Sequence, residues 1–378
     1  MNSMFRHTVL LLLFASTALA AQQSPETATT AAEAPSRDTS YIDNNGTAHV
    51  TRLIPVPRDI SPKAQLILSR GEPDEAPPEV SLSVRRGRMD AYTAAARVAW
   101  SRLCPNQIVE DKIAGVPVRI VTPEGLPEAN RDKVLLNVHG GGFNTDSGSY
   151  TESIPIAGYS KIKVVAVLYR MAPEHPFPAA VDDTVAVYKE LLKTYKPEHI
   201  VIYGTSAGAI LTPEVAVRLK QLGLPLPAAL GIFSGMGDFT HPGDSRSLFA
   251  LEGWSGHVDP PTFPRHNYQG TGIVEVNTGY PELDNYAGQT DPKDPVLSPI
   301  YADLHGMPPS LFVTSGRDQM FSGTVNLHRA FLNAGVDARL VVYDALPHAF
   351  WYNPDPDFPE SIEANHIMAD FFVKQLNK

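Results

Sequence analysis

The chain has 378 residues, of which 43% are hydrophobic and 19% are charged, so it is long enough for one large α/β domain or two smaller ones. Its 41 acidic residues outnumber its 31 basic residues and give a formal net charge of −10, without a basic stripe along the sequence. This balance argues against nucleic acid as a partner, and an acidic surface would also be repelled by anionic lipid headgroups.

Residues 1–20 have the pattern of a signal peptide. Arg6 precedes an apolar run that ends at Phe14, and residues 18–20 (Ala-Leu-Ala) form a small-residue cleavage site. The apolar run is too short to cross a bilayer, and no second long apolar stretch follows it. We therefore expect an exported protein, periplasmic or secreted, with no stable membrane span after cleavage; an uncleaved N-terminal anchor is the alternative.

The next segments contain few strand signals. Residues 21–40 are mostly small and polar and cannot bury enough surface to offset their ordering entropy, so we expect a disordered spacer. Residues 41–110 combine proline-rich stretches with a predicted helix at 89–103, and we interpret them as an N-terminal helical cap. Cys104 is the only cysteine, so no internal disulfide can form and stability must come from the core.

Residues 111–378 alternate predicted strands with predicted helices. The strands are short, largely continuous apolar runs, which a parallel sheet produces when both of its faces are covered. They span residues 116–121, 134–138, 164–168, 200–203, 228–233, 311–314 and 339–343. This alternation predicts a doubly wound α/β sheet with ligands bound beyond the carboxyl ends of its strands. Residues 236–295 interrupt the alternation and are interpreted as a lid that completes the cap.

One predicted strand turns directly into a helix through a Gly-x-Ser-x-Gly motif. The strand at 200–203 leads into Gly204, Ser206 and Gly208, and an apolar helical pattern follows. This arrangement is a nucleophile elbow, in which the glycines leave room for a sharp turn and the serine hydroxyl is exposed at the sheet edge. The motif also occurs by chance in ordinary turns, so the assignment of Ser206 as a nucleophile depends on the motif's context.

A glycine-rich loop follows another predicted strand. Residues 139–143 read His-Gly-Gly-Gly-Phe, and consecutive glycines let backbone N–H groups point toward a substrate. We assign the N–H groups of Gly141, Gly142 and Ala207 as donors to an oxyanion. The alternative, a phosphate-binding loop, is disfavoured because no Lys-Ser or Lys-Thr follows. His139 is expected to be a structural partner of the loop.

Asp318 is the candidate acid. It follows the predicted strand at 311–314 and comes after Ser206, which matches the order serine, acid, histidine of such hydrolases. The alternative is that Asp318 caps the helix predicted at 319–332. Other aspartates begin a helix or lie in Asp-Pro turns and are expected to be structural: Asp182, Asp183, Asp291 and Asp294.

His348 is the candidate base, because it follows the predicted strand that ends at Tyr343. The remaining histidines that we considered lie in a proline-rich turn or lack a strand-end setting: His175, His305, His328 and His366. Metal chemistry is disfavoured, because the chain has no His-Glu-x-x-His motif and a single cysteine. We expect no metal ion and no cofactor.

Together these blocks resemble the hormone-sensitive-lipase-like carboxylesterases (bacterial family IV) of the α/β-hydrolase superfamily. The resemblance spans roughly residues 115–378 and rests on blocks at 139–143, 169–180, 182–183, 204–208, 294–295, 298–299 and 347–350. It implies a mostly parallel central sheet flanked by helices, an N-terminal helical cap, and Ser206, Asp318 and His348 as nucleophile, acid and base. It also implies esters of short to medium acyl chains as substrates.

Two positions depart from the commonest family pattern. Many members have aspartate where this chain has Thr205, although another branch has threonine there, and Asp318 is followed by Gln-Met rather than Pro-Leu. The block at 169–180 is interpreted as a scaffold that braces the oxyanion loop and the elbow. Within it, we expect Arg170 to pair with Glu174.

The sequence therefore predicts a serine esterase that works through an acyl-enzyme. A small-ligand-binding, receptor-like protein on the same fold is the alternative, as is a hydrolase of amides or lactones. No pattern in the sequence indicates an oligomeric state. Aromatic side chains of the lid either line an acyl pocket or form its core, the interpretation we favour: Phe249, Trp254, Phe263, Tyr268, Tyr280 and Tyr286.

Overall fold

The computed structural model describes residues 40–50, 54–69, 81–248 and 281–378, and the chain divides into two units at residue 55. The described part of the first unit is a small antiparallel pair, β1 (Tyr41–Ile42) with β2 (Ala48–His49). The predicted signal peptide and nearly all of the predicted spacer lie outside the described residues. Within the described residues, no helix combines the length and the apolar character needed to cross a membrane.

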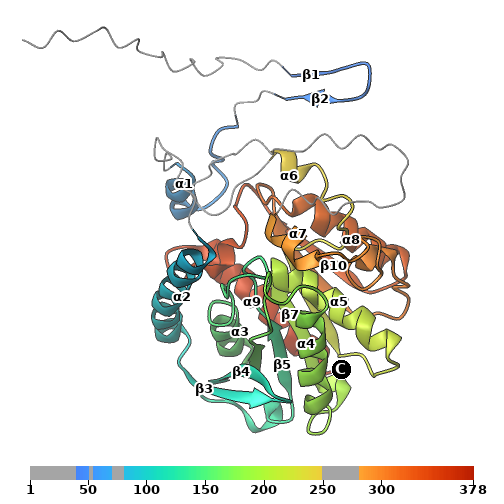
Figure 1. Ribbon diagram of the computed structural model, residues 1–378. Helices are drawn as coiled ribbons and strands as arrows, with labels where there is room; N and C mark the ends of the chain where they lie inside the picture. Colours follow the sequence, from blue (N-terminus) through green and yellow to red (C-terminus); the bar gives the residue numbers. More distant parts are fainter. Residues whose placement is uncertain (1–39, 51–53, 70–80, 249–280) are drawn as a thin grey trace, which may run out of the picture. The chain divides into compact units, whose positions relative to one another are not determined.

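The second unit is built on an eight-stranded sheet in the order β10-β9-β8-β7-β5-β6-β4-β3 (Figure 1). Its strands are β3 (Asn106–Ile113), β4 (Val116–Pro123), β5 (Val134–Val138), β6 (Lys163–Val167), β7 (Ile200–Thr205), β8 (Ala229–Phe233), β9 (Ser310–Ser315) and β10 (Ala338–Tyr343). All neighbouring pairs are parallel except β3 with β4 and β4 with β6. The predicted, mostly parallel α/β sheet is confirmed.

Helices cover both faces of the sheet and bury alternate residues of the central strands. Leu136 and Ile202 point into a core shared with α4 (Ala179–Leu191), α5 (Ala207–Gln221) and α8 (Phe321–Asn333). Their neighbours Leu135 and Val201 point into a second core with α3 (Ser153–Ser160) and α9 (Pro359–Leu376). Because both faces are covered, β5, β7, β8 and β9 are buried along their whole length.

Residues 41–110, the region expected to be a helical cap, contain helices and also strands: β1, β2 and the beginning of β3. The helices are α1 (Pro62–Leu68) and α2 (Leu82–Leu103), and α2 begins earlier than the predicted helix at 89–103 because Ser81 caps it through Val84 N–H. The helical interpretation of residues 41–110 was incomplete, since β3 begins at Asn106 and pairs with β4. β3 is an edge strand with an exposed Glu-Asp-Lys run, so it lacks the apolar pattern of the buried strands.

The remaining elements are short. They are α6 (Ser245–Leu248), α7 (Pro281–Ala287) and the 3₁₀ turns η1 (Glu128–Asn130), η2 (Pro197–His199), η3 (Pro299–Tyr301) and η4 (Phe350–Tyr352). Both α6 and α7 lie within the predicted lid at 236–295, whose residues 249–280 lie outside the described part of the chain.

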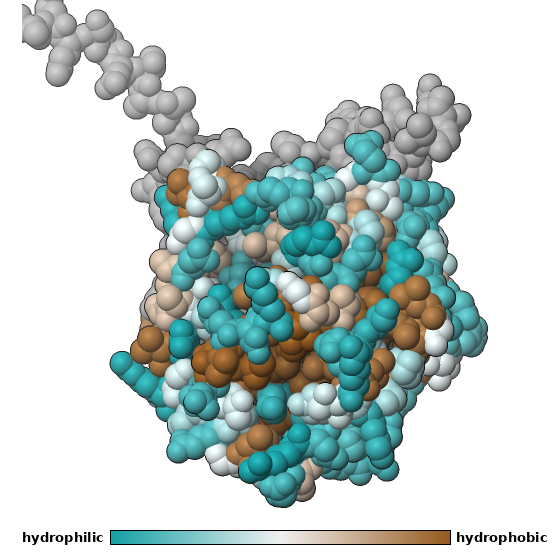
Figure 2. All heavy atoms as spheres, turned by 60° about the horizontal axis from the view of Figure 1, so that its bottom comes forward, coloured by the Kyte–Doolittle hydropathy of each residue, from teal (hydrophilic) through white to brown (hydrophobic). Residues whose placement is uncertain are grey.

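The sheet gathers the predicted site residues at one edge. Strands β5, β7, β8, β9 and β10 run parallel, so the loops that follow them leave from the same side. Figure 2 shows the face that comes forward from the bottom of Figure 1, where apolar residues form a central band surrounded by polar ones.

Candidate active site

Ser206 lies at the sharp turn between β7 and α5. Its backbone has φ 59° and ψ −120°, a positive-φ conformation that residues other than glycine rarely adopt. The flanking glycines permit this turn, because a Cβ at either Gly204 or Gly208 would overlap the carbonyl oxygen of Val138 in β5. The helix therefore starts in direct contact with the neighbouring strand, and this contact holds the serine at the edge of the sheet.

Replacement of Gly208 by alanine is expected to lower the free energy of unfolding by about 3 kcal/mol, because the added methyl group would overlap buried backbone that cannot move independently. Chemical denaturation of the purified variant measures this change. Gly87→Ala is the matched control: Gly87 lies in exposed α2 with no atom near the position of an added Cβ, so alanine there should leave stability unchanged or raise it slightly. Equal stability of both variants would contradict the close packing at the elbow.

The glycine loop follows β5 and faces the elbow. Gly141 and Gly142 have φ values of +115° and +60°, which explains the need for glycine at both positions. The loop is closed on itself, because the carbonyl oxygen of Gly141 accepts hydrogen bonds from the N–H and the hydroxyl of Thr145, both at 2.9 Å. Ala207 is the first residue of α5, so its N–H has no partner within the helix.

His139 and Tyr169 hold the beginning of this loop. The buried His139 ring stacks on Tyr169 at 4.2 Å between centroids, and its Nδ1 lies 2.9 Å from the Gly140 carbonyl oxygen. The Tyr169 hydroxyl donates to the His139 carbonyl oxygen at 2.7 Å. His139 is therefore a structural partner of the loop, as predicted.

Asp318 and His348 are brought together by the loops after β9 and β10. Asp318 Oδ1 lies 2.8 Å from His348 Nδ1 and accepts a hydrogen bond from Met320 N–H at 2.8 Å. Its other oxygen accepts from the hydroxyls of Ser234 and Thr314, the latter at 3.1 Å. Asp318 also lies just before α8. Its side chain contacts His348 and accepts a hydrogen bond from Met320 N–H at the start of the helix.

The Asp318 carboxyl is fully buried, and its protonation state follows from its partners. Burial alone would raise its pKa, but the adjacent His348 and the hydrogen bonds from His348, Ser234 and Met320 N–H hold the pKa below its ordinary value. The aspartate is therefore ionised over the whole neutral range and can stabilise positive charge on the imidazole.

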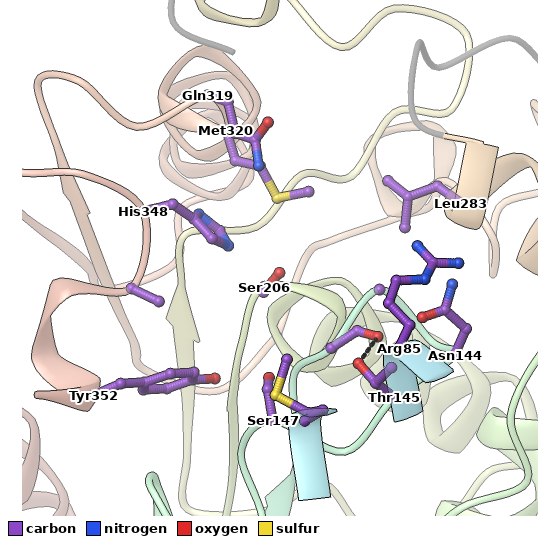
Figure 3. A pocket seen from close by; sticks show the side chains of 14 residues that line it. Arg85, Asn144, Thr145, Ser147, Ser206, Leu283, Gln319, Met320, His348 and Tyr352 are labelled. Carbon is purple, nitrogen blue, oxygen red and sulfur yellow. Dashed lines mark hydrogen bonds between the residues drawn. The ribbon is translucent and has the colours of Figure 1, made fainter. Parts of the chain in front are cut away.

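Ser206, His348, Gly141 and Gly142 line one pocket of about 220 Å³. In Figure 3 the imidazole of His348 points toward the Ser206 hydroxyl from the opposite side of the pocket to Thr145. The rest of the described lining is Arg85, Met89, Asn144, Thr145, Ser147, Leu283, Gln319, Met320, Ala349 and Tyr352.

Several of these lining residues had no signal in the sequence. Arg85 and Met89 come from α2 and Leu283 comes from α7, so both predicted cap segments contribute to the pocket. Their positions depend on how the cap packs on the sheet, which no local pattern encodes. Ser234, which donates to Asp318, directly follows β8, and its strand-end place was the only available hint.

The threonine that departs from the commonest family pattern has a defined role. Thr205 is buried, and its hydroxyl oxygen accepts a hydrogen bond from Trp351 Nε1 at 3.1 Å. Trp351 lies in η4, three residues after His348. The bond therefore ties the elbow to the loop that carries the histidine.

The block at 169–180 packs against the glycine loop, as a brace would. Ala172 N–H donates to the Phe143 carbonyl oxygen at 2.8 Å. The expected pairing of Arg170 with Glu174 was wrong: Arg170 pairs with Asp183 at 2.8 Å, and Glu174 pairs with Arg86 of α2 at 2.7 Å. Arg170 and Glu174 are close in sequence, but α4 and α2 bring the actual partners from farther away.

The other acids and histidines have structural environments. Asp294 Oδ1 accepts from Val296 N–H at 2.8 Å in a turn, and His305 lies 2.7 Å from Asp303 on the surface. Of the lid aromatics, Tyr286 is buried and stacks on Phe143 at 3.5 Å, which places it in the core. The others lie outside the described residues: Phe249, Trp254, Phe263, Tyr268 and Tyr280.

Comparisons with known proteins agree with this fold and site. A family model described as alpha/beta hydrolase fold matches residues 135–352. An acetyl-hydrolase of Streptomyces hygroscopicus is 30% identical over 263 residues, which cover 68% of this chain and 81% of that protein. An esterase of Acinetobacter venetianus is 27% identical over 266 residues, covering 68% and 80%.

Solved structures give the same result. An esterase from the bacterial hormone-sensitive lipase family superposes with a TM-score of 0.69 at 29% identity, covering 84% of this chain and 99% of that one. A hormone-sensitive lipase from a metagenome library has a TM-score of 0.68 at 27% identity, covering 83% and 97%. The chain belongs to the α/β-hydrolase fold family. Within it, the chain is a carboxylic ester hydrolase of the hormone-sensitive lipase type.

Proposed function

We propose that this esterase is an exported serine hydrolase of short- to medium-chain acyl esters, with Ser206 as nucleophile, His348 as base and Asp318 as the acid that orients the base. The observation that carries the proposal is the 2.8 Å contact between His348 Nδ1 and buried Asp318 at a pocket that Ser206 also lines. A base oriented by a carboxylate beside a serine at a strained turn is the arrangement that acyl transfer requires.

The first half of the reaction forms the acyl-enzyme. Asp318 accepts a hydrogen bond from the Nδ1–H of His348, which keeps that proton on Nδ1 and leaves Nε2 unprotonated to take the Ser206 proton as the serine oxygen attacks the ester carbonyl carbon. The N–H groups of Gly141, Gly142 and Ala207 stabilise the oxyanion that develops. His348 then gives its proton to the departing alcohol, and the serine ester remains.

The second half hydrolyses this intermediate. A water molecule enters as the alcohol leaves, His348 takes its proton, and the resulting hydroxide attacks the acyl carbon. Collapse of the second tetrahedral intermediate returns the proton to Ser206 and releases the carboxylic acid. No group from outside the chain is required.

The pocket supports the proposed substrate range. At about 220 Å³ among the described residues, it has room for a small acyl group. Met89, Leu283 and Met320 give its lining apolar surface. Arg85 is the one arginine, lysine, aspartate or glutamate among the described lining residues. Export is proposed from the pattern of residues 1–20.

Labelling of cell fractions with a fluorophosphonate probe tests the proposal. We expect one covalent adduct on the peptide that contains Ser206, in the periplasm or the medium, on a protein whose N-terminus begins after Ala20. Prior incubation with p-nitrophenyl acetate should slow the labelling, because substrate and probe compete for the same hydroxyl. An unlabelled Ser206 peptide would refute the nucleophile and favour a binding protein, and label confined to the cytoplasm would refute export.

A further inference from the structure

Glu152 is a fully buried carboxylate at the start of α3 that receives four hydrogen bonds. Oε1 accepts from Gly140 N–H at 2.9 Å and from the Tyr352 hydroxyl at 2.5 Å. Oε2 accepts from the Asn137 side-chain amide at 2.8 Å and from Thr205 N–H at 3.2 Å. The proposed catalytic steps do not use this carboxylate.

These four donors belong to the segments that build the site. Gly140 directly precedes Gly141 of the proposed oxyanion loop, and Thr205 directly precedes Ser206. Tyr352 lies in η4, four residues after His348, and its ring lines the pocket. One side chain is therefore bonded to the backbone beside the proposed oxyanion donors, to the backbone beside the proposed nucleophile, and to the loop of the proposed base.

We propose that Glu152 is a positioning residue of the esterase, whose ionised carboxylate sets the spacing between the oxyanion loop and the nucleophile elbow. This proposal rests on the function proposed above for Ser206, Gly141 and Gly142. It deepens that function by naming the group that fixes their separation.

The chemistry of the donors favours an acceptor that has no hydrogen of its own. The backbone N–H groups of Gly140 and Thr205 can only donate, and only an ionised carboxylate offers acceptor sites to all four donors at once. A glutamine amide would direct its hydrogens at two of these donors, whereas a neutral carboxyl would have to turn its hydrogen toward the Tyr352 hydroxyl, the one partner that can also accept. The affected loop would then have to move away.

The two backbone segments are already in contact, so a small displacement matters. A Cβ added to Gly140 would lie 2.7 Å from the Thr205 carbonyl oxygen and 2.8 Å from the Tyr352 hydroxyl. The loop and the elbow therefore cannot approach each other further. A displacement of catalytic groups by about 1 Å can lower the rate 10²-fold. The carboxylate therefore acts on transition-state stabilisation more than on substrate binding.

Ionisation of Glu152 depends on every group around it. Burial raises the pKa of Glu152 to about 7, and the charge of Asp146 acts in the same direction, while the hydrogen bonds from Tyr352, Gly140 N–H and Asn137 lower it. Asp146 is in turn paired with Arg119 at 2.6 Å and lies 3.7 Å from His139. Tyr169 and Tyr203, both buried, complete the titratable groups near the carboxylate.

Stability and activity should therefore respond to pH in opposite directions. The folded-state pKa is above the ordinary value of 4.5, so wild-type stability is greatest below that value and falls as pH rises through about 7. If Glu152 only stabilised the fold, its advantage over glutamine would shrink with rising pH. If its carboxylate positions the site, the advantage in kcat grows over the same range.

The test compares the full chain with Glu152→Gln, using Glu214→Gln as the matched control. Glu214 is an equally buried carboxylate, but it accepts one hydrogen bond, from Tyr286 at 2.5 Å, and none from the loop or elbow backbone. At pH 8 we expect Glu152→Gln to lower kcat 10- to 100-fold on p-nitrophenyl butyrate with KM changed less than threefold. Glu214→Gln should keep kcat within threefold.

A trifluoromethyl ketone inhibitor forms a tetrahedral oxyanion with the serine. Its Ki should change if Glu152 positions the site, and should not change if Glu152 only stabilises the fold. Its Ki should rise by the same factor as kcat/KM falls in Glu152→Gln, and the wild-type-to-variant ratio of kcat should increase from pH 6 to pH 8. A Ki and kcat within threefold of wild type would overturn the positioning role if Ser206→Ala is inactive. Activity in Ser206→Ala would instead overturn the proposed function itself.

A second variant decides the matter if Glu152→Gln does not fold. Tyr352→Phe keeps the carboxylate and removes one of its four donors, so the loops should loosen without a buried charge being lost. We expect a three- to tenfold fall in kcat and an equal rise in the Ki of the trifluoromethyl ketone. Unchanged values of both would overturn the proposal.

Discussion

Asp318→Asn is expected to lower kcat for a short-chain ester by about 10⁴-fold while changing KM little. The asparagine oxygen would be held by the hydroxyls of Ser234 and Thr314, which donate to Oδ2. Its amide would then face His348 Nδ1 and donate to it, so that the imidazole carries its proton on Nε2. In that tautomer the ring cannot take the Ser206 proton. Steady-state kinetics on p-nitrophenyl acetate measure the loss.

Asp183→Asn is the control for loss of a buried aspartate. Asp183 forms an ion pair with Arg170, with 2.8 Å between the charged atoms, and is not among the residues that line the pocket. Its replacement should therefore affect stability more than kcat. Because its partners hold the Asp318 pKa below the ordinary value, Asp318 contributes stability above the unfolded-state pKa and loses it as pH falls. As the pH is lowered, the free energy of unfolding of Asp318→Asn should therefore fall less than that of the wild type. A kcat close to that of Asp183→Asn would show that Asp318 is only a helix cap.

The central strands were predictable because burial on both faces leaves a local trace. β5, β7 and β9 are enclosed by helices, and their sequences are continuous apolar runs. Parallel strands put their carboxyl ends at one edge, so the residues that follow them could be assigned to one site from the sequence alone. Ser206 and His348, far apart in sequence, line one pocket for this reason.

Elements whose environment is set by other parts of the chain left no such trace. β3 exposes most of its residues, and its pairing with β4 depends on the turn at Ala114 and Gly115, whose φ values are 52° and 83°. Glu152 lies in a segment without a recognised motif, and its donors come from three parts of the chain, residues 137–140, Thr205 and Tyr352. Such a network becomes visible only once the sheet has brought the loops together.

The cap shows the same limit of local patterns. Arg86 of α2 donates to the Asn144 carbonyl oxygen at 2.7 Å and pairs with Glu174, which fixes α2 against the glycine loop. The neighbouring Arg85 and Met89 thereby reach the pocket. A helix could be predicted here from composition, but which of its residues reach the site is decided by contacts with distant segments.

Ser206→Ala is expected to lower kcat by about 10⁶-fold and to leave substrate affinity close to that of the wild type. Alanine removes the attacking oxygen and leaves the pocket, the turn and the oxyanion donors in place, so a residual rate above that of water should remain. Mass spectrometry during turnover should show an acyl adduct on the wild type and none on the variant. A wild-type rate would exclude this serine as the nucleophile.

The double variant Ser206→Ala with His348→Ala separates a triad from independent contributions. If His348 acts only by moving the Ser206 proton, an imidazole without that hydroxyl contributes nothing, and both single variants and the double variant should share one residual rate. Multiplied losses would instead mean that His348 promotes hydrolysis by another route, such as direct activation of water. The 2.8 Å bond to Asp318 Oδ1 fixes the Nδ1 side of the ring, so only Nε2 remains for Ser206, and we expect the losses not to multiply.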